Sequence, residues 1–190
     1  MSIDRTTLGL KIMNWLEKLA KKGIKYDYSS VQFDFPTEIA TKVKKWGEKH
    51  ISDSDLYIEG DKYAREDDIH TTVKYGLVTA SVEPIKNKIK DIKPFYITLG
   101  KISRFVPSDE EYDVVKIEYN GDGLFKLNKI LCELKNEDSH PEYKPHCTIA
   151  YVKKGHCSEL SGNGELEGIR VKVDEVTFSS KTGEKSKIKF

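Results

Sequence analysis

A six-residue pattern that occurs twice constrains the fold of this chain more than any other feature of its sequence. Residues 70–75 read HTTVKY and residues 146–151 read HCTIAY, so both copies follow the order His, any residue, Thr, an aliphatic residue, any residue, Tyr. Each copy follows a predicted strand, a predicted helix and a polar loop, and each opens a further predicted strand. Two such units in succession predict an α+β fold built by internal duplication.

The spacing of apolar residues assigns the segments of both units. The first unit comprises strands over residues 26–35, 69–77 and 95–106, helices over 37–50 and 82–91, and a polar loop around a short strand over 51–68. The second comprises a strand over 112–119, a helix over 124–136, the motif strand 146–152 and one last long strand over 168–180. An amphipathic N-terminal helix over 6–22 is expected to pack on the domain. We expect a single domain, 1–190, with lobes at about 26–106 and 107–190.

The two motifs place histidine and threonine where they can work together. On a strand, side chains two residues apart lie on one face, roughly 6–7 Å from each other. His70 therefore shares a face with Thr72, and His146 shares a face with Thr148. If the two motif strands are adjacent, one imidazole can accept a proton from an attacking hydroxyl while the other donates a proton to a leaving oxygen. The threonine hydroxyls can hydrogen-bond the non-bridging oxygens of a phosphodiester.

The other positions of the motif follow from the same alternation. On a regular strand Val73 faces the core, and so does Ile149 in the second copy. Tyr75 and Tyr151 lie five residues after their histidines, so we expect them on the opposite face, in the core. Lys74 lies four residues after His70 and is predicted on the site face, either as a cation for the phosphate or as a solvated lysine.

A zinc site is the main alternative use of these residues. His146, Cys147, His156 and Cys157 offer the imidazole and thiolate ligands that structural zinc prefers. Adjacent strand residues point to opposite faces, however, and the usual ligand spacings are absent. We therefore expect no metal and no cofactor. The three cysteines are too few for a disulfide framework, which favours a reducing compartment.

Charge and hydropathy narrow the classes of partner. The chain has 32 Lys and Arg against 31 Asp and Glu, and its net charge of +1 provides no field for binding duplex DNA or an anionic membrane. No run of 18 apolar residues and no signal-peptide pattern occurs, so we expect a cytoplasmic protein. No protein partner can be inferred from these properties.

With its paired H-x-T motifs, the sequence resembles the two-histidine (2H) phosphoesterase superfamily, which is defined by two H-x-[TS]-x motifs. The match spans about residues 26–180. The resemblance implies a bilobal fold with a sheet in each lobe, a central cleft carrying both motifs, and metal-independent cleavage of phosphodiesters. The runs DLYIEGDKYAREDDIHTTVKYGL and KPHCTIAYVKKG are most similar to phage-encoded members. These include anti-CBASS nucleases, which destroy the cyclic di- and trinucleotide signals of bacterial immunity in the host cytoplasm.

This resemblance implies a mechanism and a set of substrate contacts. A ribose 2′-hydroxyl attacks its own 3′-phosphate, with one histidine as base and the other as acid, although the sequence does not assign the two roles. Aromatic residues in the loops that lead to the motifs are candidates for stacking on bases, namely Tyr57, Tyr63 and Tyr143. An acidic residue on the last strand is expected to contact a base, and Glu175 is favoured over Asp174.

Two other functions compete with hydrolysis of cyclic oligonucleotides. One is the same chemistry on RNA ends, as a 2′,3′-cyclic phosphodiesterase or a 2′,5′-specific nuclease. A net charge of only +1 favours a small ligand over a long RNA. The other is a protein that binds cyclic nucleotides without cleaving them, which would not need two intact H-x-T motifs.

Overall fold

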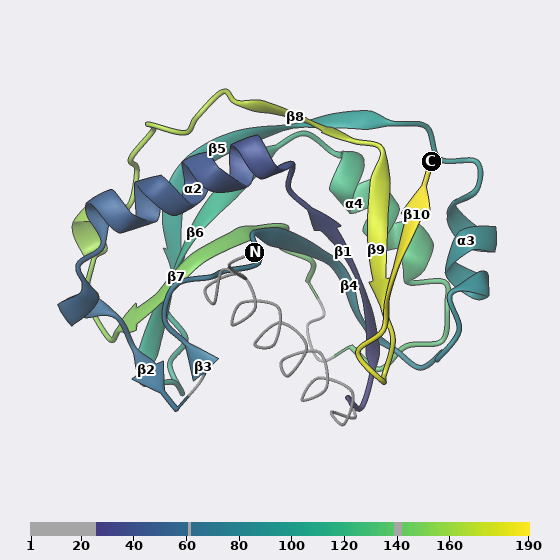
Figure 1. Cartoon of the computed structure of the whole chain (residues 1–190), viewed down its shortest axis with the longest axis horizontal. Helices are drawn as coiled ribbons and strands as arrows, with labels where there is room; N and C mark the ends of the chain where they lie inside the picture. The colour runs from purple at the N-terminus through teal and green to yellow at the C-terminus, as the bar shows by residue number, and fades with distance from the viewer. Residues whose placement is uncertain (1–25, 61, 139–141) are drawn as a thin grey trace, which may run out of the picture.

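The chain folds into two four-stranded antiparallel sheets with three α-helices, as the computed structural model shows for residues 26–60, 62–138 and 142–190 (Figure 1). This arrangement confirms the α+β class expected from the sequence. The helix predicted over residues 6–22 lies outside the described residues. No helix within the described ranges is long and apolar enough to span a membrane.

The first sheet has the strand order β10-β9-β1-β4, and the second has the order β7-β6-β5-β8. The strands are β1 (Ser29–Asp34), β4 (His70–Leu77), β5 (Phe95–Phe105), β6 (Tyr112–Asn120), β7 (Cys147–Lys153), β8 (Arg170–Val173), β9 (Glu175–Ser179) and β10 (Lys185–Lys189). A small hairpin pairs β2 (Ile58–Glu59) with β3 (Lys62–Tyr63). The helices are α2 (Thr37–His50), α3 (Glu83–Ile89) and α4 (Gly123–Leu131), with short 3-10 turns η1 (Asp53–Asp55) and η2 (Ser158–Leu160).

The two motif strands are the inner edges of the two sheets. β4 ends the first sheet, β7 ends the second, and the two strands contact each other (Figure 1). The hairpin segment continues beside β7, where the Tyr57 amide donates to the Tyr151 carbonyl and the Tyr151 amide donates to the Ala64 carbonyl. The structure thus places the two motifs next to each other, as the mechanism requires.

The sheets exchange strands across the expected lobe boundary at residues 106/107. β5 belongs to the second sheet, whereas β9 and β10 belong to the first. The single strand predicted over 168–180 is two strands, which break at Asp174 and enter different sheets. β-favouring residues continue on both sides of the break, so sequence periodicity does not reveal the crossing. The unassigned β10, KSKIK, is a lysine-rich strand at a sheet edge, where charge discourages further pairing.

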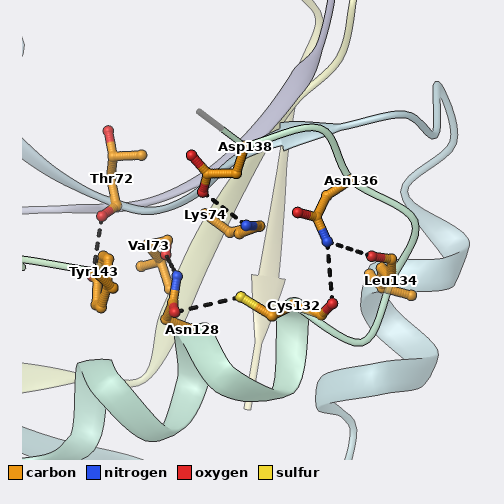
Figure 2. Close-up of polar contacts among 9 residues, drawn as sticks. All are labelled: Thr72, Val73, Lys74, Asn128, Cys132, Leu134, Asn136, Asp138 and Tyr143. Carbon is orange, nitrogen blue, oxygen red and sulfur yellow. Dashed lines mark hydrogen bonds and ion pairs between the residues drawn. The ribbon is translucent and has the colours of Figure 1, made fainter. Parts of the chain in front are cut away.

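Each of the two longer helices supports the motif strand of the other unit. α2 follows β1 but packs on β7, where a Cβ on Gly47 would lie only 2.8 Å from Cγ2 of Ile149. α4 follows β6 but packs on β4, where the Asn128 side-chain amide donates to the Val73 carbonyl at 2.7 Å (Figure 2). Val73 and Ile149 are the aliphatic residues of the two motifs. Both are buried, as predicted, so each motif is held from behind by a helix.

Candidate active site

Three of the four motif side chains predicted to act together lie on the neighbouring strands β4 and β7, and the fourth, His146, directly precedes β7. His70, Thr72, His146 and Thr148 are all partly exposed. The residues between them are buried, namely Thr71, Val73, Cys147 and Ile149. The predicted alternation is therefore present in both copies. A cavity whose lining includes Tyr57, Glu111 and Lys153 is not lined by any of the four.

A matched hydrogen bond orients the two imidazoles. His70 Nδ1 lies 2.5 Å from the carbonyl oxygen of Asp68, and His146 Nδ1 lies 2.7 Å from that of Lys144. A carbonyl oxygen only accepts hydrogen bonds, so Nδ1 carries a proton in both rings. In the neutral ring Nε2 is then the basic nitrogen, and in the charged ring Nε2 becomes a donor. Each histidine is thereby prepared to exchange protons through Nε2.

A β-bulge in β4 reverses the predicted orientation of Lys74. Thr72 pairs with Gln32 on β1, but Lys74 pairs with Val31, because the register shifts between these pairs. Residues opposite each other on antiparallel strands share a face, and consecutive residues do not. Lys74 therefore faces away from Thr72. It is only 4% exposed and its Nζ lies 2.8 Å from Asp138 Oδ2 (Figure 2). The prediction that Lys74 lies on the site face was wrong.

The same irregularity occurs in β7. Thr148 pairs with Lys116 on β6, and Ala150 pairs with Val115, with a register shift between the pairs. The residue that follows Ala150, Tyr151, is consequently turned onto the face that carries Thr148. In β4 Tyr75 follows Lys74 in the same way and is 46% exposed. The prediction that both motif tyrosines lie in the core was wrong, because one extra residue in a strand inverts the alternation beyond it.

Tyrosines gather on this face at both sheets. Tyr112 and Tyr151 of the second sheet contact Tyr57 and Tyr63 of the hairpin segment. These four residues are here termed the tyrosine cluster, and the ring centroids of contacting pairs are 4.9–5.3 Å apart. Tyr63 is held with a positive φ of 69°, an unusual backbone conformation for a residue other than glycine. Tyr57 and Tyr63 were predicted as substrate contacts, whereas Tyr151 was predicted in the core and Tyr112 was not singled out.

A smaller aromatic pair lies on the first sheet. The rings of Tyr28 and Tyr75 meet edge to face, with centroids 6.0 Å apart. The Tyr28 hydroxyl donates to Glu137 Oε2 at 2.6 Å, and this hydrogen bond is the largest cause of a raised Tyr28 pKa. Neither residue was singled out as a substrate contact from the sequence.

Tyr143 connects the loop before the second motif to the first motif. Its hydroxyl donates to the Thr72 carbonyl at 3.1 Å (Figure 2). Its ring meets Phe125 edge to face. Burial raises the Tyr143 pKa, so the hydroxyl stays protonated and continues to donate. A stacking role for Tyr143 remains a prediction. On the rear of the motif strands, the hydroxyls of Tyr119 and Thr71 form a second link between the two sheets.

Polar residues beside the first motif form a network that sequence reasoning missed. Asp34 pairs directly with His70 across β1 and β4. Its carboxylate accepts from Gln32 Nε2 and from Thr177 Oγ1, each at 2.5 Å. Thr177 pairs with Gln32, so Glu175, two residues earlier on β9, lies on the same face. Glu175 forms an ion pair with Lys187. Its predicted role in contacting a base remains untested.

A different group flanks the second motif. Lys116 pairs directly with Thr148, and its Nζ donates to Ser103 Oγ at 2.6 Å and to Glu118 Oε1 at 3.2 Å. The same Nζ lies 4.4 Å from the ring centroid of Phe105, and Phe105 packs edge to face with His146. The available signal was the lysine within the apolar run VVKI of β6, because a charged residue amid buried neighbours indicates a specific partner.

The alternative zinc site is not assembled among the described residues. Cys147 is fully buried and lies behind the strand, and burial raises the pKa of its thiol to about 12. His156 instead has its Nδ1 2.9 Å from Asp55 Oδ1. Within the described ranges, no three histidine, cysteine or acidic residues are grouped so that they could hold a metal ion.

Comparison with known proteins agrees with this arrangement. The family model described as the 2′-5′ RNA ligase superfamily matches residues 35–185. No curated protein matches the chain. Among solved structures, Escherichia coli LigT complexed with 3′-AMP has 19% identity and a TM-score of 0.55, over 87% of this chain and 96% of that one. Usb1 of Kluyveromyces marxianus has 10% identity and a TM-score of 0.57, over 86% and 98%. These likenesses confirm the fold.

Proposed function

Because the chain belongs to the 2′-5′ RNA ligase superfamily of two-histidine phosphoesterases, we propose that it cleaves the 3′,5′ linkages of cyclic di- and trinucleotides. The broader activity, that of a phosphodiesterase acting on nucleotides, follows from family membership together with the two intact motifs. The observation that carries the proposal is the pair of imidazoles, each with Nδ1 bound to a backbone carbonyl, at the starts of two contacting strands that also carry tyrosines of the two aromatic groups. In a phage-infected bacterium, such cleavage would remove the signal of CBASS immunity.

The reaction requires one base, one acid and stabilisation of the phosphate. One histidine takes the proton of the ribose 2′-hydroxyl as the bond from O2′ to phosphorus forms. The other histidine gives its proton to O5′ as the bond from phosphorus to O5′ breaks, which leaves a 2′,3′-cyclic phosphate. Water can then open this product with the two roles reversed. Thr72 and Thr148 donate hydrogen bonds to the non-bridging oxygens, whose negative charge grows in the transition state.

The distribution of tyrosines supports a substrate with a base on each side of the cleaved linkage. Each group includes a residue of one motif strand, Tyr75 of β4 in the pair with Tyr28 and Tyr151 of β7 in the tyrosine cluster. Stacking of a base on an aromatic ring contributes about 1–3 kcal/mol. A net charge of +1 agrees with a small ligand, since tracking a long RNA would favour a basic groove.

Cleavage of RNA ends is the second candidate, and the solved structures favour it. LigT has been crystallised with 3′-AMP, and Usb1 of K. marxianus with uridine monophosphate. Both ligands are single nucleotides with one base and one phosphate. A 2′,3′-cyclic phosphate at an RNA end would present the same groups to the two motifs.

The two candidates are separated by chromatography of reaction products in EDTA. The substrates are a panel of cyclic di- and trinucleotides and an RNA oligomer that ends in a 2′,3′-cyclic phosphate. The matched control carries both His70→Ala and His146→Ala. We expect the wild-type protein, and not the control, to linearise cyclic nucleotides. Opening of the RNA end alone would support the second candidate, whereas retention of ligand without product would indicate a binding protein. Activity that EDTA abolishes and zinc restores would refute the metal-independent mechanism.

A further inference from the structure

Lys116 lies on the face where the phosphodiester is expected to bind. It is the cross-strand partner of Thr148, so the two side chains project from the same face of the second sheet with Cβ atoms roughly 5 Å apart. Phe105 contacts both the Lys116 ammonium and the His146 ring. Lys116 is therefore linked to both functional residues of the second motif.

The ammonium of Lys116 is buried, and only an exposed carboxylate partly balances its charge. The residue is only 5% exposed, and a buried cation is costly unless it is paired. Its one described carboxylate partner, Glu118, lies at 3.2 Å and has a side chain that is 57% exposed. Ser103 and Lys116 hold the pKa of Glu118 below its ordinary value, so this carboxylate remains charged and in water. An anion on the motif face would compete with an exposed partner for this cation.

Lys74 shows what a purely structural lysine looks like in the same fold. It is equally buried, at 4%, but it lies on the opposite face and is paired at 2.8 Å with Asp138, whose side chain is 19% exposed. The carboxylate that balances Lys74 is therefore closer and less exposed to solvent than the one that balances Lys116. The two lysines differ in the face they occupy and in the carboxylate that balances them.

We infer that Lys116 is the phosphate-binding cation of the site and contacts a non-bridging oxygen together with Thr148. The inference rests on the proposed function for its substrate. In the resting protein Glu118 partners the ammonium, and the phosphate displaces it when substrate binds. The positive charge then opposes the negative charge that develops on the non-bridging oxygens as the 2′-oxygen attacks. Lys116 transfers no proton, so the acid and base roles stay with the two histidines.

Substitution of Lys116 by methionine tests this role, because the apolar side chain can still pack against Phe105. We expect Lys116→Met to lower kcat/KM on a cyclic dinucleotide about 100-fold, which is typical for loss of one group that stabilises a developing oxyanion. Lys116→Arg should recover part of this loss. The matched control combines Lys74→Met with Asp138→Asn, which removes the other buried pair without leaving a lone charge. This control should stay within about threefold of wild type.

Equilibrium binding separates the inference from the proposed reaction. Calorimetry should show that Lys116→Met weakens the binding of 3′-AMP at least tenfold while leaving the binding of adenosine, which has no phosphate, unchanged. Equal losses for both ligands, or no loss for 3′-AMP, would overturn the inference. If Lys116→Met weakens the binding of 3′-AMP but the wild-type protein cleaves no cyclic nucleotide, the proposed function is refuted and the phosphate-binding role of Lys116 stands. If Lys116→Met cleaves the cyclic dinucleotide with the kcat/KM of wild type, the phosphate-binding role of Lys116 is refuted and the proposed function stands.

Discussion

The two motif strands have the same sequence pattern but different neighbours. β4 and β7 both have a bulge after the threonine, and both pack against a helix from the other unit. The motif histidine is the first residue of β4 and directly precedes β7, and in both its Nδ1 binds a backbone carbonyl. Beside His70 lies Asp34 with its two hydrogen-bond donors, whereas beside Thr148 lies the Lys116 ammonium. The duplicated residues offer the same functional groups from both halves. The unduplicated neighbours differ in charge, so we expect the two halves of the site to contact the substrate differently.

The largest expected effect concerns the residues that the two halves share. His70→Ala and His146→Ala should each lower kcat/KM on a cyclic dinucleotide by about 10²–10⁴, because each removes one proton transfer. Steady-state kinetics with each purified variant measures the loss. Full activity in either variant would show that the two motifs are not both required for catalysis.

The threonines should show the next largest effect. Thr72→Val and Thr148→Val keep the β-branched shape and remove only the hydroxyl, so we expect losses in kcat of about 10- to 1,000-fold with little change in thermal unfolding. A loss at Thr148 but none at Thr72 would show that the phosphate is held by the second sheet alone. That result would assign phosphate binding to the second sheet, which also carries Lys116.

The motif tyrosines test whether the bulges matter for substrate binding. Tyr75→Ala and Tyr151→Ala should each raise KM about 5- to 100-fold, since each removes a ring on which a base can stack. Tyr151→Phe is the matched control, because the ring remains, and it should behave like wild type. A KM unchanged in both alanine variants would mean that the bases bind elsewhere.

The smallest effect is expected at the link between the halves. Tyr143→Phe removes the hydrogen bond to the Thr72 carbonyl and should lower the free energy of unfolding by about 1 kcal/mol. Urea denaturation measures the stability, and kcat should fall only a few-fold. A loss of kcat as large as that of Thr72→Val would instead place Tyr143 in direct contact with substrate.

The sequence was most informative where local periodicity decides structure. The helix predicted over residues 37–50 has the same bounds in the structure, and the alternation of His70 and Thr72 against Val73 is confirmed. The predicted faces of Lys74, Tyr75 and Tyr151 were wrong because each motif strand contains a bulge. A bulge depends on pairing with a partner strand, and nothing within the motif itself encodes it.

Long-range pairing explains the remaining differences. The strand predicted over 168–180 divides because its two parts pair with β5 and β1, in different sheets. The apolar run VVKI marks Lys116 as unusual, but only the β6–β7 register places it opposite Thr148. The site therefore combines a motif that is visible in sequence with neighbours that only tertiary structure reveals.

The most direct test of the central claim, that both motifs act on one phosphodiester, is a double-mutant cycle on the two histidines. It compares kcat/KM in EDTA for wild type, His70→Ala, His146→Ala and the double variant. Residues that act as a unit are strongly non-additive, so we expect the double variant to lose little more activity than either single variant. Losses that multiply would show that the two imidazoles act independently and would contradict a single site shared by β4 and β7.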